Sequence, residues 1–265
     1  MDTESDTGLD TGLDIERLAL VVARRAAAEI EDTARETYRV TRKSTEQDLL
    51  TEADLRSESV IMDLLRTARP DDAVLAEESG YQAGRSGVTW IVDPLDGTAN
   101  FVRASPHYAV SVAAVSGERW LASVIVRPAD GQWMATLDGS LDGSFTRSPG
   151  PAERHVRVAV ALPYGAEELK EAHGILRLVG RRYQVVRTGS AACDLLRVAA
   201  RTLDAHIAVA LPWWDTAAGH GLVRAGGGTV TRGRSLRRTR IDIAGEPAVV
   251  RALLGLLTEH RHVVG

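Results

Sequence analysis

The stretch that decides the fold of this chain is Trp90–Phe101, with the sequence WIVDPLDGTANF. It begins inside Val88–Val92, an apolar run that predicts a buried strand ending at an Asp-Pro turn. Asp93 and Asp96 stand three residues apart across this turn, so their carboxylates can face the same point. Mg²⁺ takes oxygen ligands and is usually held by one or two carboxylates together with substrate phosphate. The turn therefore predicts a metal site at the end of a strand.

The residues directly after the turn predict a phosphate site. Gly97 and Thr98 open a helix, whose free N–H groups and positive dipole end can accept an anion beside the metals. Asp-Pro and Asp-Gly are also ordinary turn dipeptides. Taken alone, the turn is compatible with either a metal site or a purely structural bend.

Helical and strand-like segments alternate along the chain, which is typical of an α/β fold. Upstream, we expect helices over Ile15–Glu31 and Thr51–Thr67, the second with an inner face of Leu55, Ile61, Met62 and Leu65, and a strand over Val74–Ala76. Further strands are expected over Tyr108–Val115, Trp120–Val126, Val156–Ala161, Tyr183–Arg187 and His206–Val209. Further helices are expected over Glu167–Val179, Ser190–Arg201, Thr216–Ala225 and Ala248–Thr258.

Composition divides the chain into a tail and two domains. Residues 1–14 are acidic and lack apolar periodicity, so we expect a disordered tail. Leu137–Pro151 is rich in Gly, Ser, Asp and Pro, which predicts a domain boundary. The expected domains are an N-terminal α+β domain over 15–150, with most of the metal ligands, and a C-terminal α/β domain over 151–265, with Asp215 and the substrate pocket.

Charge and length favour a protein that acts on a small molecule. The chain has 265 residues, 44% of them hydrophobic, and a net charge of -4 with both signs intermixed. This balance argues against a nucleic-acid or membrane partner. The longest apolar runs fall far below the roughly 20 residues of a membrane helix. Cys193 is the only cysteine, and no signal peptide is apparent, so a cytoplasmic location is expected.

Three further acidic elements can join the Asp93 turn. Glu77 and Glu78 follow a predicted strand, where both can be exposed loop acids. Glu77 is otherwise a metal ligand, and Glu78 at most supports the ligands from outside. Asp54 stands three residues after Thr51, which is the spacing of a capping box at a helix start. Asp215 precedes a predicted helix, where it either caps the helix or reaches a metal. Each of them therefore has a structural alternative beside the functional one.

In their order along the chain, these elements resemble the inositol monophosphatases and their relatives, which act on inositol phosphates, fructose bisphosphate, histidinol phosphate and 3′-phosphoadenosine phosphates. The matching stretches are Lys43–Asp54, Ala76–Gly80, Asp93–Phe101, Gly189–Ala192 and Trp214–Gly219. They cover most of residues 43 to 228. The resemblance implies a layered α-β-α-β-α sandwich, Mg²⁺ as cofactor, a homodimer and inhibition by lithium.

The resemblance also implies a role for individual residues. The implied metal ligands are Glu77, Asp93, the Leu95 carbonyl, Asp96 and Asp215. The phosphate would lie on the N–H groups of Gly97 and Thr98. The Thr98 hydroxyl, paired with Asp54, would orient the attacking water, so Asp54, Thr98 and Glu77 form the expected catalytic set. Ala191 would line the substrate pocket.

Two residues near these motifs have open roles. Lys43 is either an exposed lysine or a lysine near the phosphate. His220 follows Asp215 on the same predicted helix and is expected to be a packing or surface residue, because Mg²⁺ prefers oxygen ligands.

The chain departs from the family pattern at two places. Ala208 stands where inositol-selective members commonly carry a glutamate that binds substrate hydroxyls. Arg232–Arg240 holds five arginines in nine residues, which form either a solvated face or a site for a second phosphate or an acidic partner.

We therefore predict a Mg²⁺-dependent phosphomonoesterase in which metal-activated water attacks a small phosphorylated polyol, such as inositol monophosphate or a related sugar phosphate. The alternative substrates are 3′-phosphoadenosine 5′-phosphate and histidinol phosphate. The alternative without catalysis is a regulatory protein that senses metal or phosphate.

Overall fold

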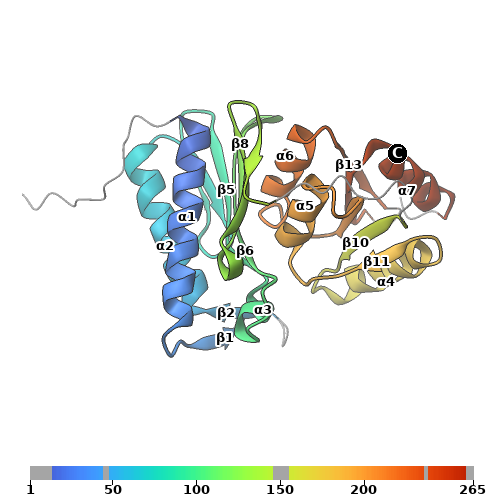
Figure 1. Cartoon of the computed structure of the whole chain (residues 1–265), viewed down its shortest axis with the longest axis horizontal. Helices are drawn as coiled ribbons and strands as arrows, with labels where there is room; N and C mark the ends of the chain where they lie inside the picture. Colours follow the sequence, from blue (N-terminus) through green and yellow to red (C-terminus); the bar gives the residue numbers. More distant parts are fainter. Residues whose placement is uncertain (1–13, 44–47, 146–154, 236–237, 261–265) are drawn as a thin grey trace, which may run out of the picture.

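The computed structural model describes residues 14–43, 48–145, 155–235 and 238–260. Five layers follow one another across the molecule: a helix pair, a sheet, a second helix pair, a second sheet and a third helix pair (Figure 1). The bounds of these helices are α1 Ile15–Ala34, α2 Glu52–Ala68, α5 Ala191–Ala199, α6 Ala217–Ala225, α4 Ala166–Gly180 and α7 Pro247–Glu259. The order of layers confirms the α-β-α-β-α sandwich that the sequence predicts.

The first sheet has seven strands in the order β4-β3-β5-β6-β7-β8-β9. Their bounds are β3 Ala73–Ala76, β4 Gly80–Gln82, β5 Thr89–Asp96, β6 Ala109–Ser116, β7 Arg119–Arg127, β8 Gln132–Leu137 and β9 Ser140–Gly143. β3 and β5 are parallel, and the other neighbours are antiparallel. A separate hairpin is made by β1 Val40–Arg42 and β2 Leu49–Thr51.

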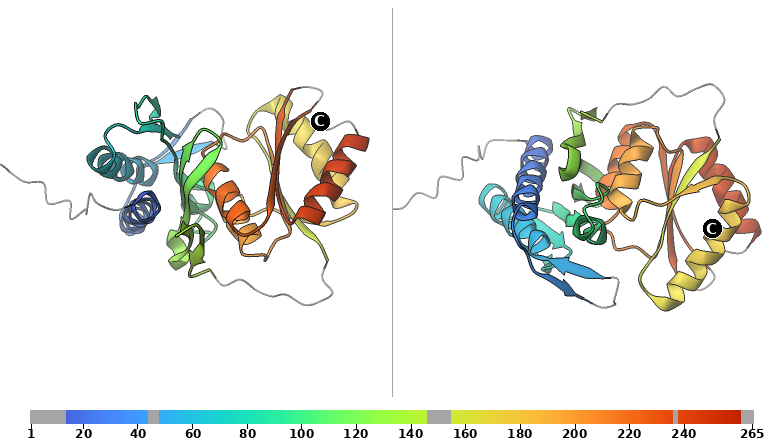
Figure 2. Two further views of the ribbon diagram at one scale, coloured as in Figure 1. Left: turned by 90° about the horizontal axis from the view of Figure 1, so that it is seen from above. Right: turned by 60° about the horizontal axis from the view of Figure 1, so that its bottom comes forward.

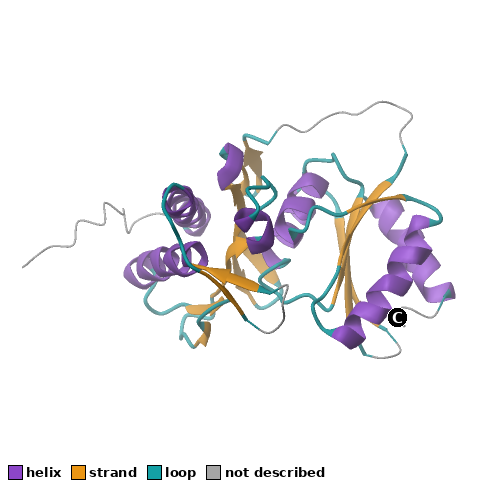
Figure 3. Cartoon of the chain, turned by 90° about the horizontal axis from the view of Figure 1, so that it is seen from below, coloured by secondary structure: helices purple, strands orange, loops and turns teal. Residues whose placement is uncertain are grey.

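The second sheet has five strands in the order β11-β10-β12-β14-β13 (Figure 2). Their bounds are β10 Arg157–Ala161, β11 Gln184–Val186, β12 Ala205–Val209, β13 Thr229–Arg234 and β14 Arg240–Gly245. One sheet face packs on α5 and α6, which lie between the two sheets, and α4 and α7 cover the other face (Figure 3). Helix α3, Thr98–Val102, and the 3-10 turn Pro128–Asp130 complete the described elements.

Several sequence expectations need correction. Leu55 is 49% exposed and does not belong to the inner face of α2. On the first turns of this helix, Asp54, Ser57 and Glu58 are buried instead, because they hydrogen-bond to neighbouring segments. Asp14, assigned to the tail, is the N-cap of α1 and accepts a hydrogen bond from the Arg17 N–H at 2.8 Å. Short polar strands such as β4 and β9 carry no clear apolar alternation, so the sequence did not predict them.

The predicted domain boundary can be located only in part. Leu137–Pro151 contains strand β9, and residues 146–150 of this stretch lie outside the described residues. The division at residue 150 therefore stays a prediction. Within the described ranges, no helix is long and apolar enough to cross a bilayer.

Candidate active site

A bulge shifts the register of strand β5 near its end. β5 continues through Pro94 to Asp96, whereas the sequence predicts that the strand ends at the Asp93-Pro94 turn. Opposite β6, Asp93 pairs with Ser111 and Asp96 with Ala109, so two residues of β5 face one residue of β6 between these pairs. Such a bulge changes the direction of the side chains beside it. The Leu95 N–H donates to Asp93 Oδ1 at 3.0 Å, which fixes the carboxylate over the bulge.

Gly97 allows α3 to begin directly after the bulge. Its φ is +93°, in the left-handed region, and a Cβ at this position would lie 2.7 Å from the His107 carbonyl oxygen. A residue with a side chain is therefore excluded by both strain and space. The following hydroxyl, Thr98 Oγ1, lies 2.9 Å from Asp54 Oδ1 and 3.1 Å from the Leu95 carbonyl oxygen, and it can donate to either.

Asp54 has two roles at once, one for each carboxylate oxygen. Oδ2 accepts hydrogen bonds from the Thr51 N–H at 2.7 Å and the Thr51 hydroxyl at 2.6 Å, which completes the predicted capping box of α2. Oδ1 faces Thr98. Burial raises the pKa of Asp54, while the hydrogen bonds from Thr51 and Thr98 oppose this effect. The helix cap thus holds a carboxylate against the hydroxyl that was predicted to orient water.

Four carboxylates from three parts of the chain share one electrostatic neighbourhood. Burial raises the pKa of Asp93 well above its usual value, and the nearby Glu77, Asp96 and Asp215 raise it further. Burial also raises the pKa of Asp215 well above its usual value, and the charges of Asp96 and Glu77 raise it further. Glu77 directly follows β3, whereas Asp93 and Asp96 lie at the end of β5. Asp215 lies just before α6. The four predicted side-chain ligands therefore lie close enough to influence one another's charge.

Asp96 is held by the start of α5. Its Oδ2 accepts hydrogen bonds from the Ser190 hydroxyl and the Ala192 N–H, both at 2.6 Å. Burial raises the pKa of Asp96 to about 7, although these two hydrogen bonds lower it. The sequence did not single out Ser190, whose Gly-Ser-Ala-Ala context was the available signal. Ala191 packs with Ala208 and Leu211 and is not among the described residues that line the cleft below.

Lys43 lies next to the proposed ligand Glu77, and its place beside a phosphate stays a prediction. Its Nζ donates to Glu77 Oε1 at 2.7 Å and also to Glu78 Oε1. Burial lowers the pKa of Lys43, but Glu77 and Glu78 outweigh this effect and raise it. Burial raises the pKa of Glu78 to about 7. A residue missed from the sequence, Glu58, holds this turn by accepting the Glu78 N–H at 2.9 Å and the Ser79 N–H at 2.8 Å.

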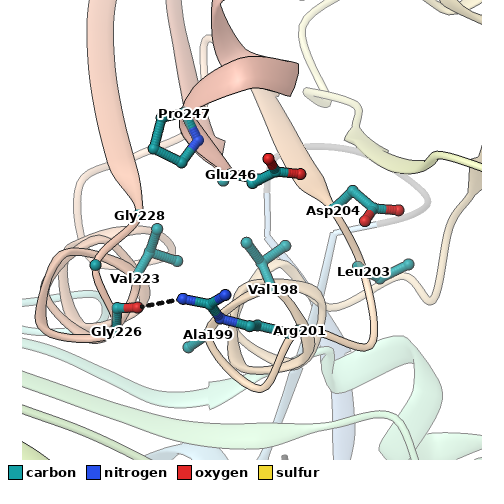
Figure 4. A pocket seen from close by; sticks show the side chains of 12 residues that line it. Val198, Ala199, Arg201, Leu203, Asp204, Val223, Gly226, Gly228, Glu246 and Pro247 are labelled. Atoms are coloured by element: carbon teal, nitrogen blue, oxygen red, sulfur yellow. Dashed lines mark hydrogen bonds between the residues drawn. The ribbon is translucent and has the colours of Figure 1, made fainter. Parts of the chain in front are cut away.

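A cleft of about 590 Å³ opens beside the carboxylates. It is lined by Lys43, Asp48, Glu77, Glu78, Pro163, Tyr164, Gly165, Glu168, Ala210, Leu211, Pro212, Trp214 and Asp215. Its volume is in the range of small-molecule sites. A second cavity of about 280 Å³ lies between the ends of α5 and α6 and the start of α7, where Arg201 donates to the Gly226 carbonyl (Figure 4). None of the predicted site residues lines this second cavity.

The described arginines of the cluster do not line the cleft, although the charge of Arg240 opposes the rise that burial causes in the pKa of Asp215. The Arg232 guanidinium lies 5.4 Å from the ring centroids of both Trp120 and Trp213. Arg240 donates to the Leu211 carbonyl, and its Nε lies 3.3 Å from Asp242 Oδ2. Leu236 and Arg237 are outside the described residues. The described arginines of Arg232–Arg240 do not line the cleft, so they give no support to a site for a second phosphate there.

His220 is a packing residue. It is fully buried, and burial lowers its pKa well below the usual value, with His206, Arg232 and Arg240 acting in the same direction. Because its side chain is buried, His220 is a packing residue and not a surface residue. It does not line the cleft. The alternative role of Asp215 as a helix cap is not seen, because Thr216 is the N-cap of α6 and no side chain caps this helix.

The donor set suits a hard divalent cation. Its members are carboxylates, which Mg²⁺ prefers, and burial followed by their mutual repulsion raises the pKa values of Asp93 and Asp215. A bound cation would remove this repulsion. In the described ranges, no three Asp, Glu, His or Cys side chains already converge as a finished metal centre, and Lys43 instead neutralises Glu77. These residues therefore provide the negative charge and the oxygen ligands that Mg²⁺ needs. Their side chains would have to move closer to one another when a cation binds.

The pKa of Asp96 sets the pH dependence of stability without metal. Burial raises this pKa to about 7, above the value near 4 of an unfolded aspartate. Between these values the folded protein binds more protons than the unfolded chain, so its stability falls as the pH rises through this window. Asp93 and Asp215 act in the same direction. His206, whose pKa burial lowers to about 3, destabilises the fold only on acidification below about pH 6.5.

We therefore expect Mg²⁺ to stabilise the protein more at pH 8.5 than at pH 6.5. At the higher pH the carboxylates are charged, repel one another and are ready to bind a cation. A saturating concentration should raise Tm by roughly 5 °C or more at pH 8.5. The measurement is a thermal melt at both pH values with and without Mg²⁺. Equal shifts at the two pH values would show that these carboxylates are not the binding site.

Comparisons with known proteins agree with this fold. A family profile described as "Inositol monophosphatase family" matches residues 14–261. The Nus factor SuhB of Escherichia coli K12 is 35% identical over 219 residues, covering 78% of this chain and 81% of the relative. An inositol-1-monophosphatase of Caulobacter vibrioides is 37% identical over 196 residues, covering 69% and 75%. The structure of the suhB protein from Bartonella henselae superposes with a TM-score of 0.81 at 31% identity, covering 91% of this chain and 97% of that one.

Proposed function

The chain belongs to the inositol monophosphatase family, and from this premise we propose that it is a Mg²⁺-dependent phosphomonoesterase of small phosphorylated alcohols. Water attacks phosphorus, the P–O bond to the alcohol breaks, and the alcohol leaves with a proton while inorganic phosphate remains. The observation that carries the proposal is the meeting of four buried or half-buried carboxylates with the Thr98–Asp54 hydrogen bond.

Each residue of the site has a proposed task. The Mg²⁺ ligands are Glu77, Asp93, the Leu95 carbonyl, Asp96 and Asp215. When bound, Mg²⁺ would acidify water and neutralise charge on the leaving oxygen. The other tasks fall to the chain around these ligands.

The Thr98 hydroxyl, which lies 2.9 Å from Asp54 Oδ1, would hydrogen-bond to the attacking water and orient it. Glu77 lies close enough to Asp93 to raise its pKa, so it would act on the same metal ions. The N–H groups of Gly97 and Thr98 would bind phosphate oxygens at the start of α3, and Ala191 would contribute shape behind the pocket. We also propose the homodimer and the lithium sensitivity that family membership predicts.

The family makes monophosphates of polyols and sugars the first substrates to test. Ala208 offers no carboxylate for substrate hydroxyls, so selectivity for inositol has no support from this position. A second candidate is a role without catalysis, because relatives at 35% identity bear the name Nus factor. The proposed catalytic and ligand residues are all present, which favours the enzyme.

The test is release of inorganic phosphate from a panel of phosphomonoesters with and without Mg²⁺. The panel contains inositol 1-phosphate, fructose 1,6-bisphosphate, histidinol phosphate and 3′-phosphoadenosine 5′-phosphate. We expect turnover that requires Mg²⁺. No turnover of any ester, in a protein that Mg²⁺ nevertheless stabilises against heat, would favour the role without catalysis.

A further inference from the structure

Two arginines and two tryptophans alternate on the surface beside α6, and we call this set the arginine–tryptophan ladder. The Arg224 guanidinium lies 4.6 Å from the ring centroid of Trp120. The Arg232 guanidinium lies 5.4 Å from the centroids of both Trp120 and Trp213. Arg224 belongs to α6, Trp120 to β7 and Arg232 to β13, whereas Trp213 lies in the segment before α6. The ladder therefore contains parts of both sheets and of the helix between them.

The ladder presents positive charge to solvent. Both arginines are exposed, and both tryptophans are half-buried. Among the described residues, no carboxylate forms a salt bridge with Arg224 or Arg232. Asp242 lies opposite Arg232 in the sheet, but it is buried and pairs with Arg240. Burial raises the pKa of Asp242, and the charges of Arg240 and Arg232 oppose this rise. A guanidinium stays charged in proteins, so the ladder can still bind an anionic partner.

An acidic segment with interspersed apolar residues fits this surface. A guanidinium binds a carboxylate through two parallel hydrogen bonds, and a ring beside it limits its motion before binding. The half-buried indole rings offer apolar area to an aliphatic side chain. A free phosphate ion would contact the cations but not the rings. The alternation of cations and rings therefore favours a peptide over a small anion.

The N-terminus of the chain supplies a segment of this composition. Residues 1–13, which lie outside the described residues, contain four acidic side chains, two leucines and no Lys, Arg or His. These side chains are Asp2, Glu4, Asp6, Asp10, Leu9 and Leu13. The whole chain has 36 acidic and 32 basic residues, so removal of these four acids would leave 32 of each. The net negative charge of the chain is therefore that of its first 13 residues.

Contacts at the start of α1 lead from this segment toward the ladder. Asp14 caps α1 by accepting the Arg17 N–H, and the Arg17 guanidinium lies 3.4 Å from Asp138 in the turn between β8 and β9. Leu141 of β9 packs next to the end of α6, where its Cδ1 lies 3.0 Å from the position of a Cβ on Gly226. This end of α6 carries the first arginine of the ladder.

The segment is long enough for this path. An extended chain spans about 3.3 Å per residue, so 13 residues span roughly 43 Å. Figure 1 shows the start of α1 and helix α6 on the two sides of the first sheet, both toward its upper end. β9 is the edge strand of this sheet. The segment would therefore have to pass only around this edge to reach the ladder.

We propose that residues 1–13 bind the arginine–tryptophan ladder of the same chain. Their carboxylates pair with Arg224 and Arg232, and their leucines contact the indole rings. The contact ties the start of α1 to the segment before α6, which contains Trp213 and, two residues later, the proposed ligand Asp215. The inference concerns an intramolecular interaction and goes beyond the proposed phosphatase function.

The test places a fluorophore on the segment of the full-length chain. Ser5→Cys introduces a reactive thiol, whereas the native Cys193 is buried and burial raises the pKa of its thiol to about 12. Bimane attached at position 5 loses fluorescence on contact with tryptophan. Tethering gives an effective concentration in the mM range, so even a weak contact is formed in about half of the molecules. We expect the fluorescence to rise about twofold as NaCl increases from roughly 50 to 500 mM, because salt screens the contact.

Variants of both partners test the residues. Arg224→Gln combined with Arg232→Gln should raise the fluorescence at low salt to the high-salt level. Replacement of the four acids of the segment by Asn and Gln should have the same effect without any change in the described part of the chain. Arg182→Gln is the matched control, because Arg182 is also exposed and lies 6.0 Å from the ring centroid of Tyr183, outside the ladder.

The outcomes are distinct. Quenching that both sets of variants relieve and Arg182→Gln leaves intact would support the proposal. No quenching in the parent chain at low salt, or quenching that remains in the double arginine variant, would overturn it. Quenching that grows with protein concentration would assign the ladder to the segment of a second copy and overturn the contact within one chain. None of these readouts requires turnover, so their failure leaves the proposed phosphatase function unaffected.

Discussion

Replacement of Asp93 by Asn should lower Mg²⁺-dependent kcat/KM by about a thousandfold or more, because it removes the central charge of the proposed metal site. Asn retains an oxygen at Oδ1 that can accept the Leu95 N–H, so the bulge in β5 should persist. The variant also loses one of several buried like charges. Without metal it should therefore be at least as stable as the parent protein.

The measurement combines initial rates of phosphate release with thermal melts in the presence and absence of Mg²⁺. We expect the rate and the stabilisation by Mg²⁺ to disappear together in Asp93→Asn, with Tm without metal maintained. Asp63→Asn serves as the control, because the Asp63 side chain is 71% exposed on α2 and pairs with Arg66 one turn along the same helix. Full activity of Asp93→Asn would refute the site assignment, and a collapse of Tm without metal would show that the residue is structural.

Replacement of Thr98 by Val should lower kcat by about a hundredfold with little change in KM. The substitution preserves the shape of the side chain and removes the hydroxyl that lies 2.9 Å from Asp54 Oδ1, which we propose directs the attacking water. Asp54→Asn should lower kcat by a similar factor. Because both residues act on one water, the double variant should be hardly slower than either single variant.

Thr51 separates the catalytic role of Asp54 from its role as a helix cap. Thr51→Val removes the hydroxyl that bonds Oδ2 at 2.6 Å, while the Thr51 N–H bond to the same oxygen can remain. We expect a loss of about 1 kcal/mol in the free energy of unfolding and retention of most activity. Chemical denaturation and rate measurements on Thr51→Val and Thr98→Val provide the comparison. A large loss of kcat in Thr51→Val, or additive losses in the double variant, would contradict the assigned roles.

Strong apolar periodicity made most of the fold predictable. The helices α1, α2, α4, α5, α6 and α7 and the strands β3, β5, β6, β7, β10, β11 and β12 appear close to their predicted positions. The hairpin β13–β14 was not predicted, because arginines dominate its sequence around Arg232–Arg240. Arg232 can occupy a strand there because two tryptophans distant in sequence cover its guanidinium. A prediction from neighbouring residues alone cannot include such contacts between distant parts of the chain.

The identity of the site residues was predictable in part. The Asp93 turn and the capping box of Asp54 follow from local spacing, and the sequence order of the motifs indicated which family they resemble. Ser190, which binds Asp96, and Glu58, which holds the turn after Glu77, were missed. Each of them binds a partner from another element, and only Ser190, within the matching stretch Gly189–Ala192, had a local signal.

The sequence by itself determined the α/β class and the order of the acidic motifs, because these depend on periodicity and on local spacing. Only the tertiary structure decided that Lys43 pairs with Glu77, that Leu55 is exposed, and that no described arginine lines the cleft. These features depend on which charges and surfaces meet after the two sheets have packed on α5 and α6. Burial and Coulomb interaction depend on distance in space, and folding brings together residues that lie far apart in the sequence.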